Sequence, residues 1–141
     1  MSEHNGEQVI EAELNLRPQD RFSNPNNYAI APEHDTSYCS FKIDAPKRSG
    51  VYWISLDGIV VYVGRAKCLH NRLSIQYGTV SPRHPFKGGQ LQKCRTNAKI
   101  NAALHAGSSV AFRWEACEDY VEREKRILED PKRRPPWNLR S

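Results

Sequence analysis

The chain has no long hydrophobic run. Its first twenty residues, MSEHNGEQVIEAELNLRPQD, mix acidic side chains with single aliphatic ones. A membrane-spanning helix needs about 20 consecutive apolar residues, and a secretory signal needs an apolar centre of roughly 7–15 residues. This N-terminal stretch satisfies neither requirement. We therefore expect a cytoplasmic protein with no membrane partner.

Cysteine is scarce, and its spacing does not suggest a metal site. The four cysteines, Cys39, Cys68, Cys94 and Cys117, form no CxxC pair. Zinc frameworks and small secreted disulfide scaffolds both depend on closely spaced cysteines. Cys68 and His70 are near neighbours, but on a helix they would point to nearly opposite sides and could not share an ion. We expect four reduced thiols.

The length of 141 residues fits one ordinary domain with an added segment. A hydrophobic content of 38% can close a modest core, whereas nine prolines and a mean hydropathy of -0.73 indicate a large share of loop. Residues 1–45 show no sustained period, contain the stretch FSNPNNYAIAPEHD, and offer only a weak edge-strand pattern over 37–43. We predict an N-terminal arm over 1–45 and a folded domain over 46–141.

Charge is distributed unevenly along the chain. Residues 1–49 hold five Lys or Arg and eight Asp or Glu, a net charge of -3. Residues 50–141 hold 16 basic and eight acidic side chains, a net charge of +8. Such a basic region is suited to binding a polyanion such as nucleic acid. A solvated basic surface without a partner is an equal alternative from charge alone.

The strongest local pattern is a β-hairpin. Two β-branched and aromatic runs, residues 51–56 and 59–63, flank the turn sequence Asp57-Gly58. A third alternating run over 109–116 predicts another strand. Together with the helices below, these runs predict an α/β (α+β) fold with a small three-stranded, mainly antiparallel sheet flanked by helices.

Three helices are expected around this sheet. The first covers about 66–77 and stops at Gly78, the second is capped by Thr96 and ends before Gly107, and the third covers 118–130 before Pro131. On the first helix, the apolar stripe comprises Ala66, Leu69, Leu73 and Tyr77. Arg65, Arg72 and Gln76 cluster beside that stripe, where the guanidiniums could hold a phosphate or form a solvated basic face.

The third helix carries a carboxylate in an unusual position. Its apolar face is formed by Tyr120, Val121, Ile127 and Leu128, and Glu124 projects into the middle of that face. A buried, isolated carboxylate is costly by several kcal/mol unless a cation compensates it. The compensating cation could be Arg72, a structural ion-pair partner, or a divalent metal that takes one carboxylate together with waters and substrate oxygens.

The ordered positions of several residues resemble the GIY-YIG nuclease family. Gly50-Val51-Tyr52 and Tyr62-Val63-Gly64 are similar to the two halves of the family signature. Arg72 follows at the position of the family's catalytic arginine, Glu124 at that of its metal-binding glutamate, and Asn138 at that of its terminal asparagine. The resemblance covers residues 50–138.

The resemblance implies a Mg²⁺-dependent DNA endonuclease, with Mn²⁺ as an alternative ion, of the free-standing phage or restriction type. In that reading Tyr52, its pKa lowered by nearby cations, activates the attacking water as a general base, and Tyr62 orients the water or the phosphate. Arg72 clamps the phosphate and Glu124 holds the metal. The structural residues at the site are Gly64 and the clasp Asn138.

One position departs from the family pattern. Many members carry a His or Tyr four residues after the catalytic arginine, where this chain has Gln76, so any such role passes to Tyr77 or His84. The hairpin must also bring both signature tyrosines to one face. A strict two-residue turn would separate them, so we predict a three-residue loop, Leu56-Asp57-Gly58.

The expected partner is DNA. Contacts to its phosphates are assigned to Arg65, His84, Lys87, Arg95 and Lys99. Two further functions stay open: a structure-specific repair or recombination nuclease, and a non-catalytic nucleic-acid-binding module on the same scaffold. Residues 1–45 are assigned to homo-oligomer contacts (dimer or tetramer) or to DNA specificity, with a simple covering strand and loop as the alternative.

Overall fold

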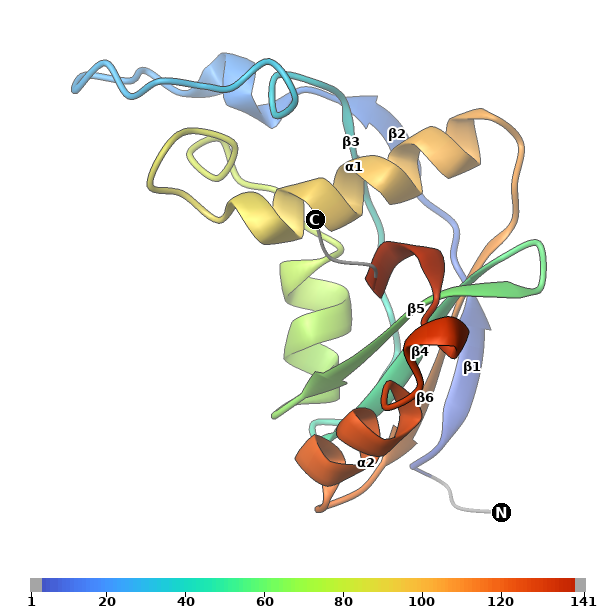
Figure 1. The fold of residues 1–141 in the computed structure, drawn as a ribbon. Helices are drawn as coiled ribbons and strands as arrows, with labels where there is room; N and C mark the ends of the chain where they lie inside the picture. The colour runs from blue at the N-terminus through green and yellow to red at the C-terminus, as the bar shows by residue number, and fades with distance from the viewer. Residues whose placement is uncertain (1–3, 139–141) are drawn as a thin grey trace.

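The centre of the molecule is a four-stranded antiparallel sheet. We describe residues 4–138 of a computed structural model. The sheet order is β1 (Gly6–Val9), β6 (Val110–Ala116), β4 (Gly50–Leu56) and β5 (Ile59–Ala66) (Figure 1). The expected mixed α/β fold with an antiparallel sheet flanked by helices is confirmed. The predicted three strands are joined by β1, whose four residues pair with β6 at the edge.

The turn between β4 and β5 is a two-residue turn, so the predicted three-residue loop is wrong. Asp57 and Gly58 have φ angles of 50° and 83°, and Leu56 pairs directly with Ile59. The register then shifts between Ile54 and Ser55. That shift leaves Val61 as an extra residue on β5, a β-bulge. The bulge changes the parity of the pairing, and this brings the two signature tyrosines to the same face after all.

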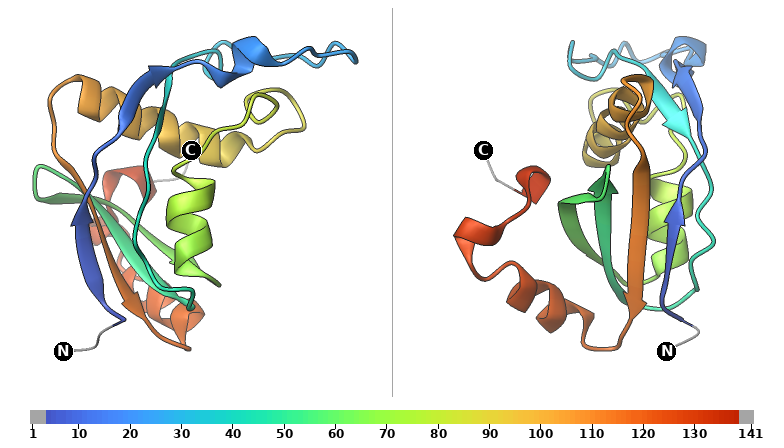
Figure 2. Two further views of the ribbon diagram at one scale, coloured as in Figure 1. Left: turned by 180° about the vertical axis from the view of Figure 1, so that it is seen from behind. Right: turned by 90° about the vertical axis from the view of Figure 1, so that its right-hand side faces the viewer.

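Two layers cover the sheet, one on each face. The helix α2 (Tyr120–Ile127) and two C-terminal 3-10 turns, η3 (Pro131–Arg133) and η4 (Pro136–Asn138), lie on one side (Figure 2). On the other side lie the π-helix η2 (Asn71–Gln76) and the connection from β3 to β4. The larger core forms on this second face, around the buried side chains Tyr52, Ile54, Leu69, Leu73, Ile100 and Phe112.

The first two helices do not begin where the sequence predicted. The first, η2, begins later than expected, and the second, α1, begins earlier. Strand β5 continues through Ala66, so Arg65 belongs to a strand and does not share a helix face with Arg72. Helix α1 (Leu91–His105) begins five residues before Thr96, and its N-cap residue Gln90 makes no side-chain capping bond. The predicted Thr96 cap is therefore wrong, because Thr96 lies inside the helix.

The N-terminal segment packs into the body of the fold. A second, two-stranded sheet pairs β2 (Glu13–Leu16) with β3 (Tyr38–Ser40), and a 3-10 turn, η1 (Pro18–Arg21), follows β2. Ile10, Cys39, Phe41 and Ile43 all enter the main core. Val9, by contrast, is exposed. The oligomer or specificity role of this segment stays a prediction.

Loop 22–30 of the same segment is joined to loop 81–89. The guanidinium carbon of Arg83 lies 3.9 Å from the ring centroid of Tyr28 and 5.7 Å from that of Phe22. The backbone N–H of Lys87 donates to the carbonyl of Ala29 at 2.7 Å. These contacts hold the loop that precedes α1.

A buried amide fixes α1 against η2. Asn97 is fully buried, and its Oδ1 accepts a hydrogen bond from the Cys39 N–H at 2.8 Å. Its Nδ2 donates to the carbonyls of Cys39 at 2.8 Å and Tyr77 at 2.6 Å. Removing such a buried partner typically costs about 1–3 kcal/mol. Asn97 therefore sets where the C-terminal end of η2 lies relative to α1.

Within residues 4–138, no helix is long and apolar enough to cross a membrane. All four cysteines are free thiols. Burial raises the pKa of Cys39 to about 12 and that of Cys94 to about 11, so both stay protonated near neutral pH. The last α-helix also differs in one detail from its expected face: Val121 is 43% exposed, while Tyr120, Ile127 and Leu128 pack on the sheet.

Candidate active site

The hairpin presents two tyrosines side by side. Tyr52 pairs with Gly64, and Tyr62 pairs with Ile54, so both phenols project from the same face with ring centroids 6.1 Å apart. A Cβ atom at Gly64 would lie 2.4 Å from both Cζ and the hydroxyl oxygen of Tyr52. Glycine is therefore required at this position, because only an absent side chain lets the fully buried Tyr52 ring lie across β5.

A third phenol joins them from the end of η2. The N–H of Tyr77 donates to the carbonyl of Arg72, five residues earlier, at 3.0 Å. In an α-helix the residue above Arg72 would be Gln76; the wider π turn places Tyr77 there instead. The Tyr77 and Tyr52 hydroxyl oxygens are 2.6 Å apart, and the two rings meet edge to face with centroids 5.9 Å apart.

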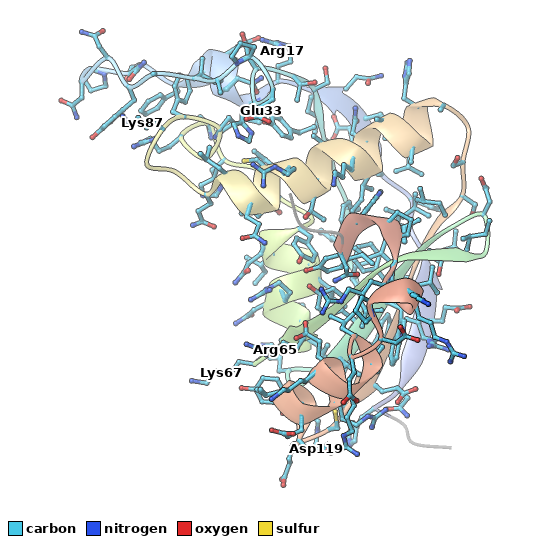
Figure 3. The ribbon with its side chains drawn as sticks, viewed as in Figure 1. Arg17, Glu33, Arg65, Lys67, Lys87 and Asp119 are labelled. Carbon is cyan, nitrogen blue, oxygen red and sulfur yellow. The ribbon has the colours of Figure 1, made fainter. Side chains whose placement is uncertain are left out.

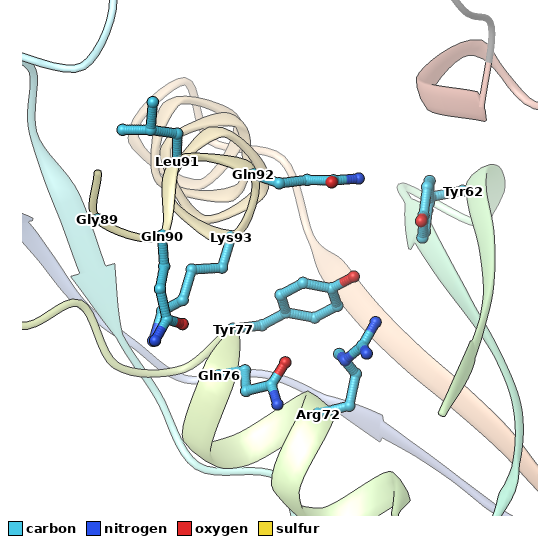
Figure 4. Close-up of a pocket in the computed structure, with 9 residues that line it drawn as sticks. All are labelled: Tyr62, Arg72, Gln76, Tyr77, Gly89, Gln90, Leu91, Gln92 and Lys93. Carbon is cyan, nitrogen blue, oxygen red and sulfur yellow. The ribbon is translucent and has the colours of Figure 1, made fainter. Parts of the chain in front are cut away.

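Arg72 lies beside this cluster of phenols. Its side chain is half-buried, and the buried Nε–H has no hydrogen-bond partner within residues 4–138. A guanidinium N–H that is removed from water without an acceptor is costly, and an anionic ligand would satisfy it. In Figure 4 the guanidinium points into the space between Tyr77 and Tyr62. The arrangement suits a tetrahedral oxyanion.

An open cavity of about 400 Å³ connects these groups to solvent. Its wall is formed by Tyr62 on β5, by Arg72, Gln76 and Tyr77 on and after η2, and by residues 89–93 at the start of α1 (Figure 4). Among residues 4–138, no carboxylate lines it. The cavity is therefore polar and positively charged, as a phosphate site requires.

Burial controls the titration of the tyrosines. Tyr52 is fully buried, and this burial, followed by the neighbouring Tyr77 and Tyr62, raises its pKa well above the usual range. Burial also raises the pKa of the half-buried Tyr62, with Tyr77 and the negative charge of Glu124 contributing. The expectation that cations lower the pKa of Tyr52 is therefore wrong, because desolvation outweighs the influence of Arg72.

Glu124 lies on α2, close to the edge strand β5. The Glu124 side chain is 19% exposed, and its carboxylate lies 3.3 Å from the guanidinium of Arg65. The Arg65 side chain, labelled in Figure 3, is 48% exposed. The compensating cation is therefore Arg65 and not Arg72. Tyr62 and Arg65 project from opposite faces of β5, so Glu124 does not line the cavity. It is still close enough to Tyr62 to affect the pKa of that phenol.

Asn138 holds the same edge strand from outside the sheet. Its Oδ1 accepts from the N–H of Val63, and its Nδ2 donates to the carbonyl of Val63, each at 2.8 Å. The side chain thus satisfies both backbone groups of a strand that has no neighbour on this side. This geometry fixes the segment of β5 between Tyr62 and Gly64.

The other residues assigned to DNA lie at various distances from the cavity. His84 accepts at Nδ1 from the Ser81 N–H at 3.1 Å and is not part of the cavity wall. Lys87 is exposed, in a loop well away from Arg65. Arg95 is exposed on α1. Lys99 is also exposed there, and its Nζ lies 5.4 Å from the Trp137 ring centroid.

Sequence reasoning missed Lys93, because it began the helix only at Thr96. The side chain belongs to the first turn of α1, is only 9% exposed and forms part of the cavity wall. An earlier helix start would have placed Lys93, Asn97 and Asn101 on one face at intervals of four. That polar stripe is the signal in the sequence.

The described residues could hold a divalent ion through a single carboxylate, that of Glu124. Within residues 4–138 there is no group of three or more His, Cys, Asp or Glu side chains that could enclose a metal. Glu124 offers a single, partly exposed carboxylate beside Arg65 on β5. Mg²⁺ fits such a site, because it commonly binds one or two carboxylates and completes its shell with waters and phosphate oxygens.

Comparison with known proteins shows a similarity to a solved structure. No family model matches the sequence, and no curated protein matches it. Among solved structures, a mutant of EndoII from bacteriophage T4 has a similar fold, with a TM-score of 0.54 and 23% sequence identity. The similar region covers 79% of this chain and 87% of the EndoII chain. At this level of identity the similarity establishes the fold: the chain shares the architecture of bacteriophage T4 EndoII.

Proposed function

We propose that the protein is a Mg²⁺-dependent DNA endonuclease of the GIY-YIG type that hydrolyses phosphodiester bonds. The observation that carries the proposal is the convergence of Tyr62, Arg72 and Tyr77 on one open, positively charged cavity, with Glu124 close enough to Tyr62 to influence the pKa of that phenol. The shared fold with bacteriophage T4 endonuclease II supports DNA as the substrate. The basic C-terminal two thirds of the chain, with a net charge of +8, supports a polyanionic partner.

Arg72 is assigned to the scissile phosphate. Its guanidinium borders a cavity that has no carboxylate in its wall within residues 4–138, and its buried Nε–H has no partner, so a phosphate oxygen in the cavity would find free donors on this side chain. A bidentate guanidinium contact also neutralises the charge that develops as water attacks phosphorus and the leaving oxygen departs. Removing one such preorganised donor typically costs on the order of 10² to 10³ in rate.

The three phenols divide into two roles. Tyr62 lines the cavity and is only half-buried, so its hydroxyl can hydrogen-bond the attacking water or a phosphate oxygen. Tyr52 is fully buried and cannot reach a substrate, so we assign it to positioning: its hydroxyl holds that of Tyr77 at 2.6 Å. Tyr77, rather than Gln76, then supplies the group above Arg72 on η2. The position of Tyr77 supports a catalytic role over a non-catalytic binding module.

Glu124 is assigned to the metal. A divalent ion bound there would act as a Lewis acid on a phosphate oxygen and would stabilise the leaving oxygen. Arg65 now neutralises this carboxylate and would turn toward the DNA backbone once the ion is present. Arg65 and Glu124 therefore connect the metal position to phosphate binding at the edge of β5.

The test is nicking of supercoiled plasmid by purified protein. The parent should nick the plasmid with Mg²⁺ or Mn²⁺ and stop when EDTA is added. Arg72→Lys keeps the charge but loses the planar donor fork, so its rate should fall by about 10² or more. Exposed Arg126→Lys on α2 is the matched control and should retain the parent rate. An intact plasmid after incubation of folded parent with Mg²⁺ would refute the proposal.

A further inference from the structure

Lys93 is a buried cation without a counter-ion. The residue is 9% exposed, and among residues 4–138 no carboxylate or hydrogen-bond acceptor pairs with its ammonium group. Burial lowers the pKa of Lys93, as expected for an ammonium that is removed from water. A buried, unpaired charge is expensive, so folded proteins keep one only where a partner compensates it. Lys93 forms part of the wall of the open cavity, so an anion that enters the cavity would compensate this charge.

The start of α1 offers further donors at the same place. Residues 89–93 form one wall of the cavity, and the N-cap residue Gln90 makes no side-chain capping bond. The first turn of an α-helix leaves its backbone N–H groups without intrahelical acceptors and carries a partial positive charge. No acidic residue occupies this first turn. In Figure 4 the Lys93 side chain extends from α1 toward η2, alongside that of Gln90.

The electrostatics of the neighbouring loop agree with this picture. Burial lowers the pKa of His84, and the positive charges of Lys93 and Arg83 lower it further. His84 is therefore neutral near physiological pH, since its ordinary pKa is 6.5. The positive potential at this end of the cavity comes from Lys93, Arg83 and the helix start.

From these observations we propose that the N-terminal turn of α1, together with Lys93, forms a second phosphate subsite in the cavity. The inference rests on the proposed nuclease function: Arg72 takes the scissile phosphate, and Lys93 takes a neighbouring phosphate of the same strand. A cavity of about 400 Å³ lies in the range of roughly 300–1,000 Å³ that holds drug-sized ligands, so it has room for more than one phosphate group. Helix starts with a lysine are well suited to phosphate oxygens.

The subsite would orient the strand across the cavity. A strand anchored at both Arg72 and Lys93 runs from the edge of β5 toward the start of α1, which fixes which phosphodiester faces Tyr62. Lys93 thereby acts on binding and register, and it has no part in the bond-breaking step. Its removal should weaken DNA binding even where no cleavage takes place.

The experiment uses Lys93→Met, which keeps most of the side-chain volume and removes the charge. Lys125→Met, an exposed position on α2, is the control. Binding of a fluorescent duplex is measured in EDTA at several salt concentrations, so that cleavage does not intervene. Lys93→Met should bind about 10-fold more weakly than the parent, with a salt slope reduced by about one. Lys125→Met should retain the parent affinity.

Thermal unfolding separates this role from a structural one. Since Lys93→Met removes an unpaired buried charge, its Tm should equal or exceed that of the parent. Inorganic phosphate should raise the parent Tm above that in chloride of equal ionic strength, and should raise it clearly less in Lys93→Met, where only the Arg72 position remains. A strongly lowered Tm would make Lys93 a structural residue and overturn the subsite.

Failure of the subsite and failure of the nuclease proposal are distinguishable. If the parent nicks plasmid and Lys93→Met binds duplex with parent affinity and salt slope, the subsite is wrong while the nuclease stands. If the parent neither binds nor nicks DNA, the nuclease proposal fails, and the inorganic phosphate measurement then decides on the subsite. A phosphate effect that is equal in parent and Lys93→Met overturns it.

Discussion

The hydrogen bond between Tyr77 and Tyr52 leads to a stability prediction with a clear asymmetry. Tyr77→Phe removes the 2.6 Å hydrogen-bond partner of the hydroxyl of Tyr52, a fully buried residue. A buried hydroxyl that loses its partner costs about 1–3 kcal/mol. Tyr52→Phe instead leaves the Tyr77 hydroxyl, whose residue lines the open cavity where water can replace the bond. That loss should be about 0.5–1.5 kcal/mol.

The double variant provides the internal check. With both hydroxyls removed, two phenyl rings of nearly the same shape remain and no buried polar group is left without a partner, which is often close to neutral. Tyr52→Phe with Tyr77→Phe should therefore be more stable than Tyr77→Phe alone. Gln76→Met is the control for η2: Gln76 has no hydrogen-bond partner within residues 4–138, so the expected change is within about 0.5 kcal/mol.

Urea unfolding measures these differences, provided that the m-value is unchanged among the variants. Plasmid nicking by the same proteins then tests the functional assignment: Tyr77→Phe should lose more activity than Gln76→Met. The reasoning is refuted if Tyr77→Phe is no less stable than Tyr52→Phe, or if the double variant loses the sum of the two single losses. If Gln76→Met loses more nicking activity than Tyr77→Phe, the functional role at this position belongs to Gln76 and not to Tyr77.

Three further outcomes follow from the geometry. Gly64→Ala places a Cβ atom 2.4 Å from the buried Tyr52 ring and should lower the unfolding free energy by about 1–3 kcal/mol, measured by urea unfolding, with a matching loss of nicking. Asn138→Ala removes two bonds to Val63 and should cost about 1–3 kcal/mol, with faster amide exchange along β5. The free energy of unfolding should fall as pH rises from about 9 toward about 12, because burial raises the pKa of Cys39 and the thiol stays protonated to higher pH in the folded protein than in the unfolded chain. Urea titrations at several pH values measure this decline, and Cys39→Ala should flatten it.

The sequence located the hairpin but not its register. Asp57 and Gly58 identify the turn because both adopt positive φ, for which an Asp-Gly pair is well suited. The bulge at Val61 has no such signature. Valine is an ordinary strand residue, and its extra place on β5 is stabilised by burial in the core. Local residue propensity cannot predict a β-bulge whose position is set by packing in the core.

The geometry around Arg72 was beyond sequence reasoning for a similar reason. A helical wheel assumes a constant rotation per residue, whereas η2 is held in a wider turn by tertiary contacts. Those contacts are the hydrogen bond between the hydroxyls of Tyr77 and Tyr52 and the hydrogen bond that the Tyr77 carbonyl accepts from Asn97. The pKa of Tyr52 was misjudged because nearby cations can be counted in a sequence, whereas complete burial cannot.

The most direct measurement compares Glu124→Gln with Glu122→Gln, an exposed position on the same helix, in plasmid nicking with Mg²⁺. Both variants should fold like the parent, because the pair between Glu124 and Arg65 is partly exposed and contributes about 1 kcal/mol at most. We predict that Glu122→Gln nicks at the parent rate and that Glu124→Gln is slower by at least about 10² to 10³. A folded Glu124→Gln protein that nicks as fast as the parent would contradict the assignment of metal-dependent hydrolysis to this site.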